Sequence, residues 1–177
     1  ESKGEKEEGE GREGEITRKD KNDEDDRMQS THEGKWIISF GLYGDDPKYI
    51  EGALENARLV REIYPEWQAR FYTLGSVRDD VLDQLLALGA EIRFEPSSEG
   101  YTVGMFWRFV VADDPEVERF IIRDTDSRIN AREALAVEEW VQSGRKFHVL
   151  RDHVNHCLPV NGGMWGATKG AVQFMNQ

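Results

Sequence analysis

A short apolar run that ends in two closely spaced carboxylates limits the folds open to this chain. Residues 120–122 are Phe-Ile-Ile, and they are followed by Arg123, Asp124 and Asp126. An apolar run without polar alternation is typical of a strand buried on both faces of a largely parallel sheet. Ligands of open α/β sheets bind beyond the carboxyl ends of such strands. Asp124 and Asp126 therefore occupy a candidate ligand site.

The spacing of this pair suits a metal ion. Residues two apart in extended backbone point to the same side, so Asp124 and Asp126 can face one cation. Carboxylate oxygens favour magnesium or manganese, which take waters and substrate phosphates as their other ligands. The sequence thus predicts a cation that bridges the pair to a diphosphate. A solvated turn is the alternative, because Asp is a common turn residue.

Composition excludes several functions. The net charge of −12 argues against a nucleic-acid partner, which requires a basic surface. Cys157 is the only cysteine, so no internal disulfide can form. No apolar run approaches the roughly 20 residues that span a bilayer, and no signal peptide is visible. A cytoplasmic protein without a membrane span is expected, although a chain that starts at Glu1 leaves its natural start, and any targeting segment, open.

Two regions differ in composition. Residues 1–34 consist almost entirely of charged and small residues, with Ile16 and Met28 as exceptions. Such a segment buries too little apolar surface to offset its ordering entropy, so a disordered acidic tail is predicted. Residues 35–177 are expected to form one folded domain.

Strand and helix patterns alternate along this domain. They predict an α/β fold with helices on both faces of a mostly parallel sheet. Ser76 is expected to cap the second helix. Right-handed crossovers place the loops after Phe40 and Ile122 at the same sheet edge. The predicted strands are 36–40, 68–74, 91–94, 120–122 and 147–150, and the predicted helices are 49–64, 77–88, 104–112, 131–141 and 164–174.

Two segments contribute candidate ligand contacts at this edge. Gly41 lets the backbone approach a ligand, and Tyr43 can stack on a nucleobase or be buried in an ordinary loop. Arg108 is the one charged residue of an apolar segment, and Arg123 and Arg128 flank the aspartates. Arginine matches phosphate oxygens bidentately, but each of these residues could instead pair with a structural carboxylate.

The region after residue 147 offers further polar groups. The three histidines of residues 148–156 and Cys157 do not match the spacing of structural zinc sites. Asp152 or His153 is a more plausible third ligand to a metal on the aspartate pair. Gly162 and Gly163 permit close backbone approach, and Trp165 is either a sugar-stacking platform or a core residue.

Together these motifs resemble those of metal-dependent glycosyltransferases of the GT-A fold, including small bacterial and algal-virus domains. The segments that carry the resemblance are 106–109, 113–115, 120–128 and 161–166, and it covers nearly everything from Trp36 onward. It implies that residues 35–177 are a Rossmann-like GT-A domain that binds a nucleotide-diphosphate sugar. A UDP-sugar, a Mn²⁺ or Mg²⁺ ion and a carbohydrate acceptor are expected.

The resemblance also implies roles for individual residues. Asp124 and Asp126 would hold the metal, with His153 as a possible third ligand. The expected donor-binding residues are Phe40, Gly41, Leu42, Tyr43, Arg108, Arg123, Asp124 and Trp165. The chain has no carboxylate beyond Cys157, so Asp152 is the candidate general base if the reaction inverts the anomeric centre. GT-A domains are usually longer, which leaves open whether another segment supplies the acceptor site.

Two other functions fit the same pair of aspartates. A haloacid-dehalogenase-type phosphatase also places an aspartyl nucleophile and an acid after a strand. Arg128 argues against it, because that motif carries Thr or Val there. The other alternative is a truncated, non-catalytic binding module.

Overall fold

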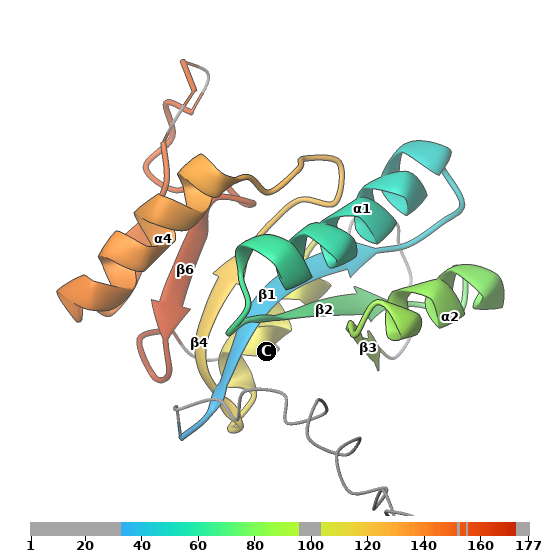
Figure 1. The fold of residues 1–177 in the computed structure, drawn as a ribbon, viewed down its shortest axis with the longest axis horizontal. Coiled ribbons are helices and arrows are strands. Elements are labelled where there is room, and N and C mark those ends of the chain that lie inside the picture. The colour runs from blue at the N-terminus through green and yellow to red at the C-terminus, as the bar shows by residue number, and fades with distance from the viewer. Residues whose placement is uncertain (1–32, 96–103, 152, 155, 173–177) are drawn as a thin grey trace, which may run out of the picture. The chain divides into compact units, whose positions relative to one another are not determined.

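The protein contains a six-stranded mixed sheet with the strand order β3-β2-β1-β4-β6-β5 (Figure 1). This computed structural model describes residues 33–95, 104–151, 153–154 and 156–172. The strands are β1 (Lys35–Leu42), β2 (Gln68–Thr73), β3 (Glu91–Phe94), β4 (Val117–Ile122), β5 (Phe147–Val149) and β6 (Trp165–Thr168). The first four are mutually parallel, and β6 is antiparallel to both β4 and β5. The predicted mostly parallel α/β fold is confirmed. Nearly all of the predicted acidic tail lies outside the described residues.

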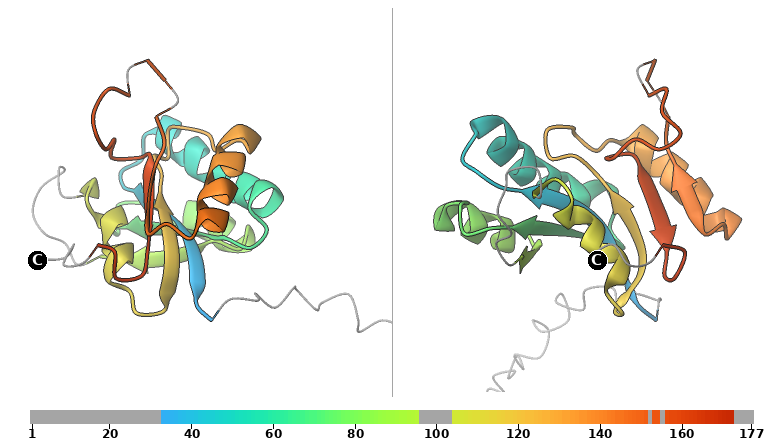
Figure 2. Two further views of the ribbon diagram at one scale, coloured as in Figure 1. Left: turned by 90° about the vertical axis from the view of Figure 1, so that its left-hand side faces the viewer. Right: turned by 180° about the vertical axis from the view of Figure 1, so that it is seen from behind.

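Helices cover both faces of the sheet, as predicted. The helices α1 (Pro47–Ile63), α2 (Asp79–Ala87) and α4 (Ala131–Ser143) lie on one face. A 3₁₀ helix, η1 (Trp107–Asp113), lies on the other face, as the view from behind shows (Figure 2). This arrangement buries the central strands β1 and β4 on both sides.

The central strands alternate between two cores. Ile38 and Phe40 of β1 pack with the α-helices, whereas Ile37 packs with Trp107 of η1. All three side chains are 0% exposed. Because both faces are covered, most positions of these strands are apolar, although Ser39 of β1 and Arg119 of β4 are buried polar exceptions. The first polar positions after β4 therefore mark a sheet edge.

Three local predictions were wrong. In place of the α-helix predicted over residues 104–112, the structure has the tighter 3₁₀ helix η1 over Trp107–Asp113. In place of the helix predicted over residues 164–174, its described part, 164–172, contains the strand β6. Gly166 allows this pairing, because a Cβ there would lie 2.5 Å from the carbonyl oxygen of Phe120. Ser76 does not cap α2, which begins after Arg78. Its hydroxyl instead accepts a hydrogen bond of 3.1 Å from the amide of Gly44.

None of the helices that the structure describes is long and apolar enough to cross a membrane.

Candidate functional site

A cleft of about 270 Å³ opens at the carboxyl ends of β1 and β4. The loops after these two neighbouring parallel strands meet there, as the sequence predicted. Side chains and backbone from four segments line the cleft, and they are Gly41, Tyr43, Tyr49, Met105, Arg108, Asp124, Thr125 and Asp126. Both predicted aspartates and the predicted arginine are therefore at one site.

The β1 wall of the cleft contains only some of the predicted nucleoside-binding residues. Gly41 and Tyr43 line the cleft, but Phe40 and Leu42 are 0% and 1% exposed. These two side chains do not line the cleft, because β1 continues to Leu42 and its alternate residues face the helical core; their donor-binding role stays a prediction. The Tyr43 ring packs edge-on against Trp107, with the centroids 6.1 Å apart.

Asp124 is held by Arg108. The Nη1 atom of Arg108 donates to Oδ1 of Asp124, and the arginine side chain is only 16% exposed. The hydroxyl of Ser39 in β1 donates to the carbonyl of Arg108 over 2.7 Å, which fixes the start of η1 on the sheet. The Nε atom of Arg108 is buried and makes no hydrogen bond within the described part of the chain. Arg108 also lines the cleft, so its guanidinium lies beside any ligand bound there.

Asp126 pairs with a residue that the sequence did not suggest. The ammonium of Lys48, in the first turn of α1, donates to Asp126 Oδ2 over 2.7 Å. This bond raises the pKa of Lys48 above its ordinary value. The two side chains are 61% and 32% exposed, so solvent and ligands can reach both.

The loop that carries the aspartates is fixed by α1. Asn56 is fully buried, and its Nδ2 donates to the carbonyls of Thr125 and Ser127 over 3.3 and 2.8 Å. Its Oδ1 accepts from the amide of Ile129 over 3.1 Å. Gly52 lets the helix approach, because a Cβ there would lie 2.0 Å from the Thr125 carbonyl oxygen. A polar residue on the apolar face of the predicted helix was the only sequence signal for this clamp.

The two predicted glycines approach the same groups from the other side. A Cβ on Gly163 would lie 2.0 Å from Oδ2 of Asp124, and one on Gly162 would lie 3.3 Å from Nη2 of Arg108. Close backbone approach at this segment is therefore a feature of the structure. The group that the backbone approaches is the aspartate–arginine pair.

Arg123 and Trp165 do not reach the cleft. Arg123 is 2% exposed, and its guanidinium donates to Glu133 of α4 and to the Ile122 carbonyl. Trp165 is 6% exposed and packs among Phe109, Phe120 and Phe147. The structure does not bring these side chains to the cleft, and their donor contacts stay a prediction. Arg123 is the first residue beyond β4 and points to the helical side, where Glu133 compensates its buried charge.

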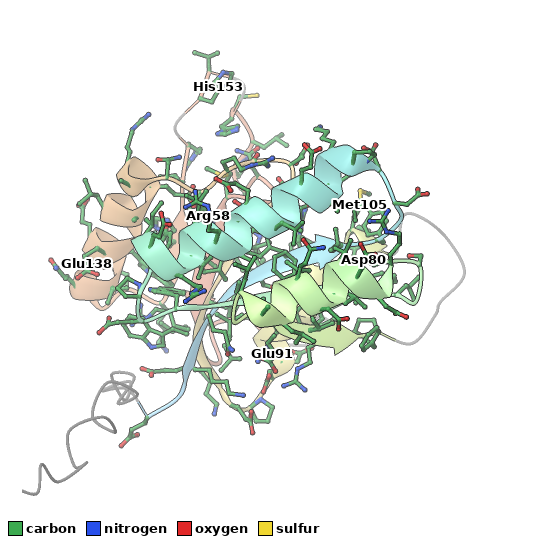
Figure 3. The ribbon with its side chains drawn as sticks, turned by 45° about the vertical axis from the view of Figure 1, so that its right-hand side comes forward. Arg58, Asp80, Glu91, Met105, Glu138 and His153 are labelled. Carbon is green, nitrogen blue, oxygen red and sulfur yellow. The ribbon has the colours of Figure 1, made fainter. Side chains whose placement is uncertain are left out.

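The predicted contributions of Asp152 and His153 differ in outcome. Asp152 lies outside the described residues, so its role as general base stays a prediction. His153 lies on the segment after β5, which projects away from the body of the domain (Figure 3). Within the described ranges, no group of three or more His, Cys, Asp or Glu side chains could hold a metal. The structure therefore does not bring His153 to the aspartate pair.

The two aspartates fit a metal ion that is shared with a ligand. Each carboxylate now pairs with a cationic side chain, which shows that the site favours positive charge at both positions. Two carboxylates cannot complete the shell of a magnesium or manganese ion, but phosphate oxygens and water commonly supply the remaining ligands. The donor set suits an ion held jointly by protein and diphosphate.

Comparisons with known proteins match the fold and not the sequence. Neither the known protein families nor the curated proteins include a match. Among solved structures, a mannosyltransferase from Pyrobaculum calidifontis in complex with GDP-Man and Mn²⁺ is 14% identical with a TM-score of 0.53. Glucosyl-3-phosphoglycerate synthase from Mycobacterium tuberculosis is 13% identical with a TM-score of 0.51.

The chain has the GT-A fold. The alignments cover 78% and 76% of this chain but 46% and 57% of the two enzymes, so this GT-A chain spans about half of their length. At these identities the likeness concerns the fold. The case for function depends on the side chains of the cleft.

Proposed function

We propose that this GT-A domain transfers a sugar from a nucleotide-diphosphate donor to a carbohydrate acceptor with the help of a divalent metal ion. One observation carries the proposal. Asp124, Asp126 and Arg108 line a single cleft at the end of the central strand β4, where open α/β sheets bind ligands. A UDP-sugar is the first donor to test, and Mn²⁺ and Mg²⁺ are the candidate ions.

Each residue of the cleft has a role in this proposal. Asp124 and Asp126 would hold the ion, which when bound neutralises charge on the departing diphosphate. Arg108, which lines the cleft beside Asp124, would donate to the same phosphate oxygens. The rings of Tyr43 and Tyr49, which both line the cleft, offer faces on which a nucleobase can stack.

The acceptor side is less complete. In the described part of the cleft wall, Asp124 and Asp126 are the only carboxylates, and both are assigned to the metal. An inverting reaction requires a further base near the acceptor hydroxyl, and we propose Asp152 for this role.

A donor-turnover assay tests the proposal. The protein is incubated with a panel of UDP- and GDP-sugars with Mn²⁺, Mg²⁺ or EDTA, and release of the nucleoside diphosphate is measured with and without simple saccharides. Metal-dependent release that Asp126→Ala abolishes, while the variant stays folded, supports the transferase. Hydrolysis of a simple phosphate monoester by the protein, without any nucleotide turnover, would favour the phosphatase instead.

A non-catalytic donor-binding module is the second candidate. It is favoured by the described cleft wall, where no carboxylate besides Asp124 and Asp126 is available as a base. Metal-dependent binding of a nucleotide sugar without transfer or hydrolysis would identify this function. The GT-A fold makes the haloacid-dehalogenase alternative the weakest of the three.

A further inference from the structure

Lys48 is placed unusually for a residue with only a structural role. It lies in the first turn of α1, where the helix dipole disfavours a positive charge. Its ammonium extends to Asp126, 2.7 Å away, and lies 5.3 Å from the centroid of the Tyr49 ring. Both Asp126 and Tyr49 line the cleft. Helix stability therefore does not explain the lysine, but proximity to a ligand does.

The pair is also not needed to hold the aspartate loop. Asn56 already binds three backbone groups of residues 125–129, and it is fully buried. Lys48 is 61% exposed, and an exposed ion pair contributes little to stability. The Lys48–Asp126 contact can therefore be exchanged for another at low cost.

The charges of the site indicate when the exchange occurs. Arg108 and Lys48 now balance Asp124 and Asp126. A divalent ion bound alone would leave two excess positive charges at close range, which is unfavourable. The diphosphate of a nucleotide sugar carries two negative charges and would restore neutrality. The ion and the donor are therefore expected to bind together.

We propose that Lys48 is a donor-binding residue. In the free protein its ammonium pairs with Asp126, and it would donate to the donor diphosphate once Asp126 binds the metal ion. The flexible four-carbon stem of lysine and its three donors permit this change of partner. The inference rests on the proposed function. It adds a phosphate ligand from α1 to Arg108 of η1, so the two cations that now pair with the aspartates would both contact the diphosphate.

Calorimetry on matched variants tests this proposal. Lys48→Gln removes the charge at the cleft. Lys35→Gln is the control, because Lys35 also forms an exposed ion pair, with Glu116 at 2.9 Å, at the other end of β1. The probes are Mn²⁺ alone, and UDP or GDP in saturating Mn²⁺.

Lys48→Gln should change the affinities for the two probes in opposite directions. Lys48→Gln frees Asp126 and removes a repelling charge, so Mn²⁺ alone should bind about 3-fold tighter. Loss of a charged hydrogen bond to phosphate should weaken nucleotide binding by about 10-fold or more. Lys35→Gln should change neither affinity.

Two other results would overturn the inference, and they are distinguishable. If the wild-type protein binds a nucleotide with Mn²⁺ and Lys48→Gln behaves like Lys35→Gln, Lys48 is only a surface ion pair and the proposed function stands. If the wild-type protein binds neither nucleotide in the presence of Mn²⁺, the proposed function fails and the role of Lys48 fails with it.

Discussion

Gly163→Ala should separate the function of the site from the stability of the domain. A Cβ at this position would lie 2.0 Å from Oδ2 and 2.5 Å from Cγ of Asp124. Ordinary van der Waals contact begins at 3.4 Å, so the carboxylate or the backbone must move by about 1.4 Å. The side chain of Asp124 is 40% exposed and can move more easily than the backbone. It should rotate away from Arg108 and out of its metal-binding position.

The substitution should affect nucleotide affinity more than the stability of the domain. Loss of a partly exposed ion pair costs up to about 1 kcal/mol, and alanine restricts the unfolded chain enough to recover about 0.4–1 kcal/mol. The free energy of unfolding should therefore change by less than about 1 kcal/mol. A ligand atom displaced by about 1 Å can cost a factor of about 100 in an assembled site, so metal-dependent nucleotide binding should fall at least about 10-fold.

Urea denaturation measures the first quantity, and calorimetry with UDP or GDP in Mn²⁺ measures the second. Gly75→Ala is the matched control, because no atom lies within 4 Å of its added Cβ. It should leave the nucleotide affinity unchanged and raise the free energy of unfolding by about 0.4–1 kcal/mol, the contribution of alanine alone. Wild-type nucleotide affinity in Gly163→Ala, or unfolding of that variant, would refute the account of this contact.

Four further variants test other parts of the structure. Asp126→Asn should abolish Mn²⁺-dependent nucleotide binding and change stability by less than about 1 kcal/mol, because its pair with Lys48 is exposed; equal affinity in calorimetry would remove Asp126 from the site. Asn56→Ala should lower the free energy of unfolding, measured by urea denaturation, by about 2–4 kcal/mol, because buried backbone groups lose their hydrogen-bond partner. A decrease below about 1 kcal/mol would show that Asn56 does not clamp the loop. Gly52→Ala should cost about 1–3 kcal/mol, since its Cβ meets a backbone oxygen that cannot rotate away, and unchanged stability would contradict this packing. Burial of His148 lowers its pKa from 6.5 to about 4, and the nearby charge of Arg123 adds to this effect. The stability contributed by the neutral imidazole is therefore fully present above pH 6.5 and is lost as the pH falls toward 4. His148→Phe should therefore lose less stability than the wild type between pH 7 and pH 5, and parallel losses would contradict the assignment.

Features that depend on the strand pattern were predictable. The apolar run of residues 120–122 predicted a strand buried on both faces, and the polar residues that follow it predicted that Asp124 and Asp126 lie at the sheet edge. Parallel topology then brought the loop after β1 to the same edge. Arg108 was identified because a lone charge in an apolar segment needs a partner.

Features that depend on strand length and side-chain direction were not predictable. One or two extra residues in β1 put Leu42 into the core, and β6 in place of a helix turned Trp165 inward. The sequence does not distinguish Arg123 from Arg108, because the partner of Arg123, Glu133, comes from α4 and is identified only in the structure. Lys48 was missed because its contact with Asp126 joins residues 78 positions apart in the sequence.

Paramagnetic broadening by Mn²⁺ tests the central claim most directly, because it reports where the ion sits. The backbone amide signals of the protein are recorded with Mn²⁺ alone and with Mn²⁺ plus UDP or GDP. The account predicts broadening centred on Thr125 and its neighbours Asp124 and Asp126, strengthened by the nucleotide and lost in Asp126→Asn. Broadening centred on His153 and His156, or none near residues 124–126 with either nucleotide, would contradict it.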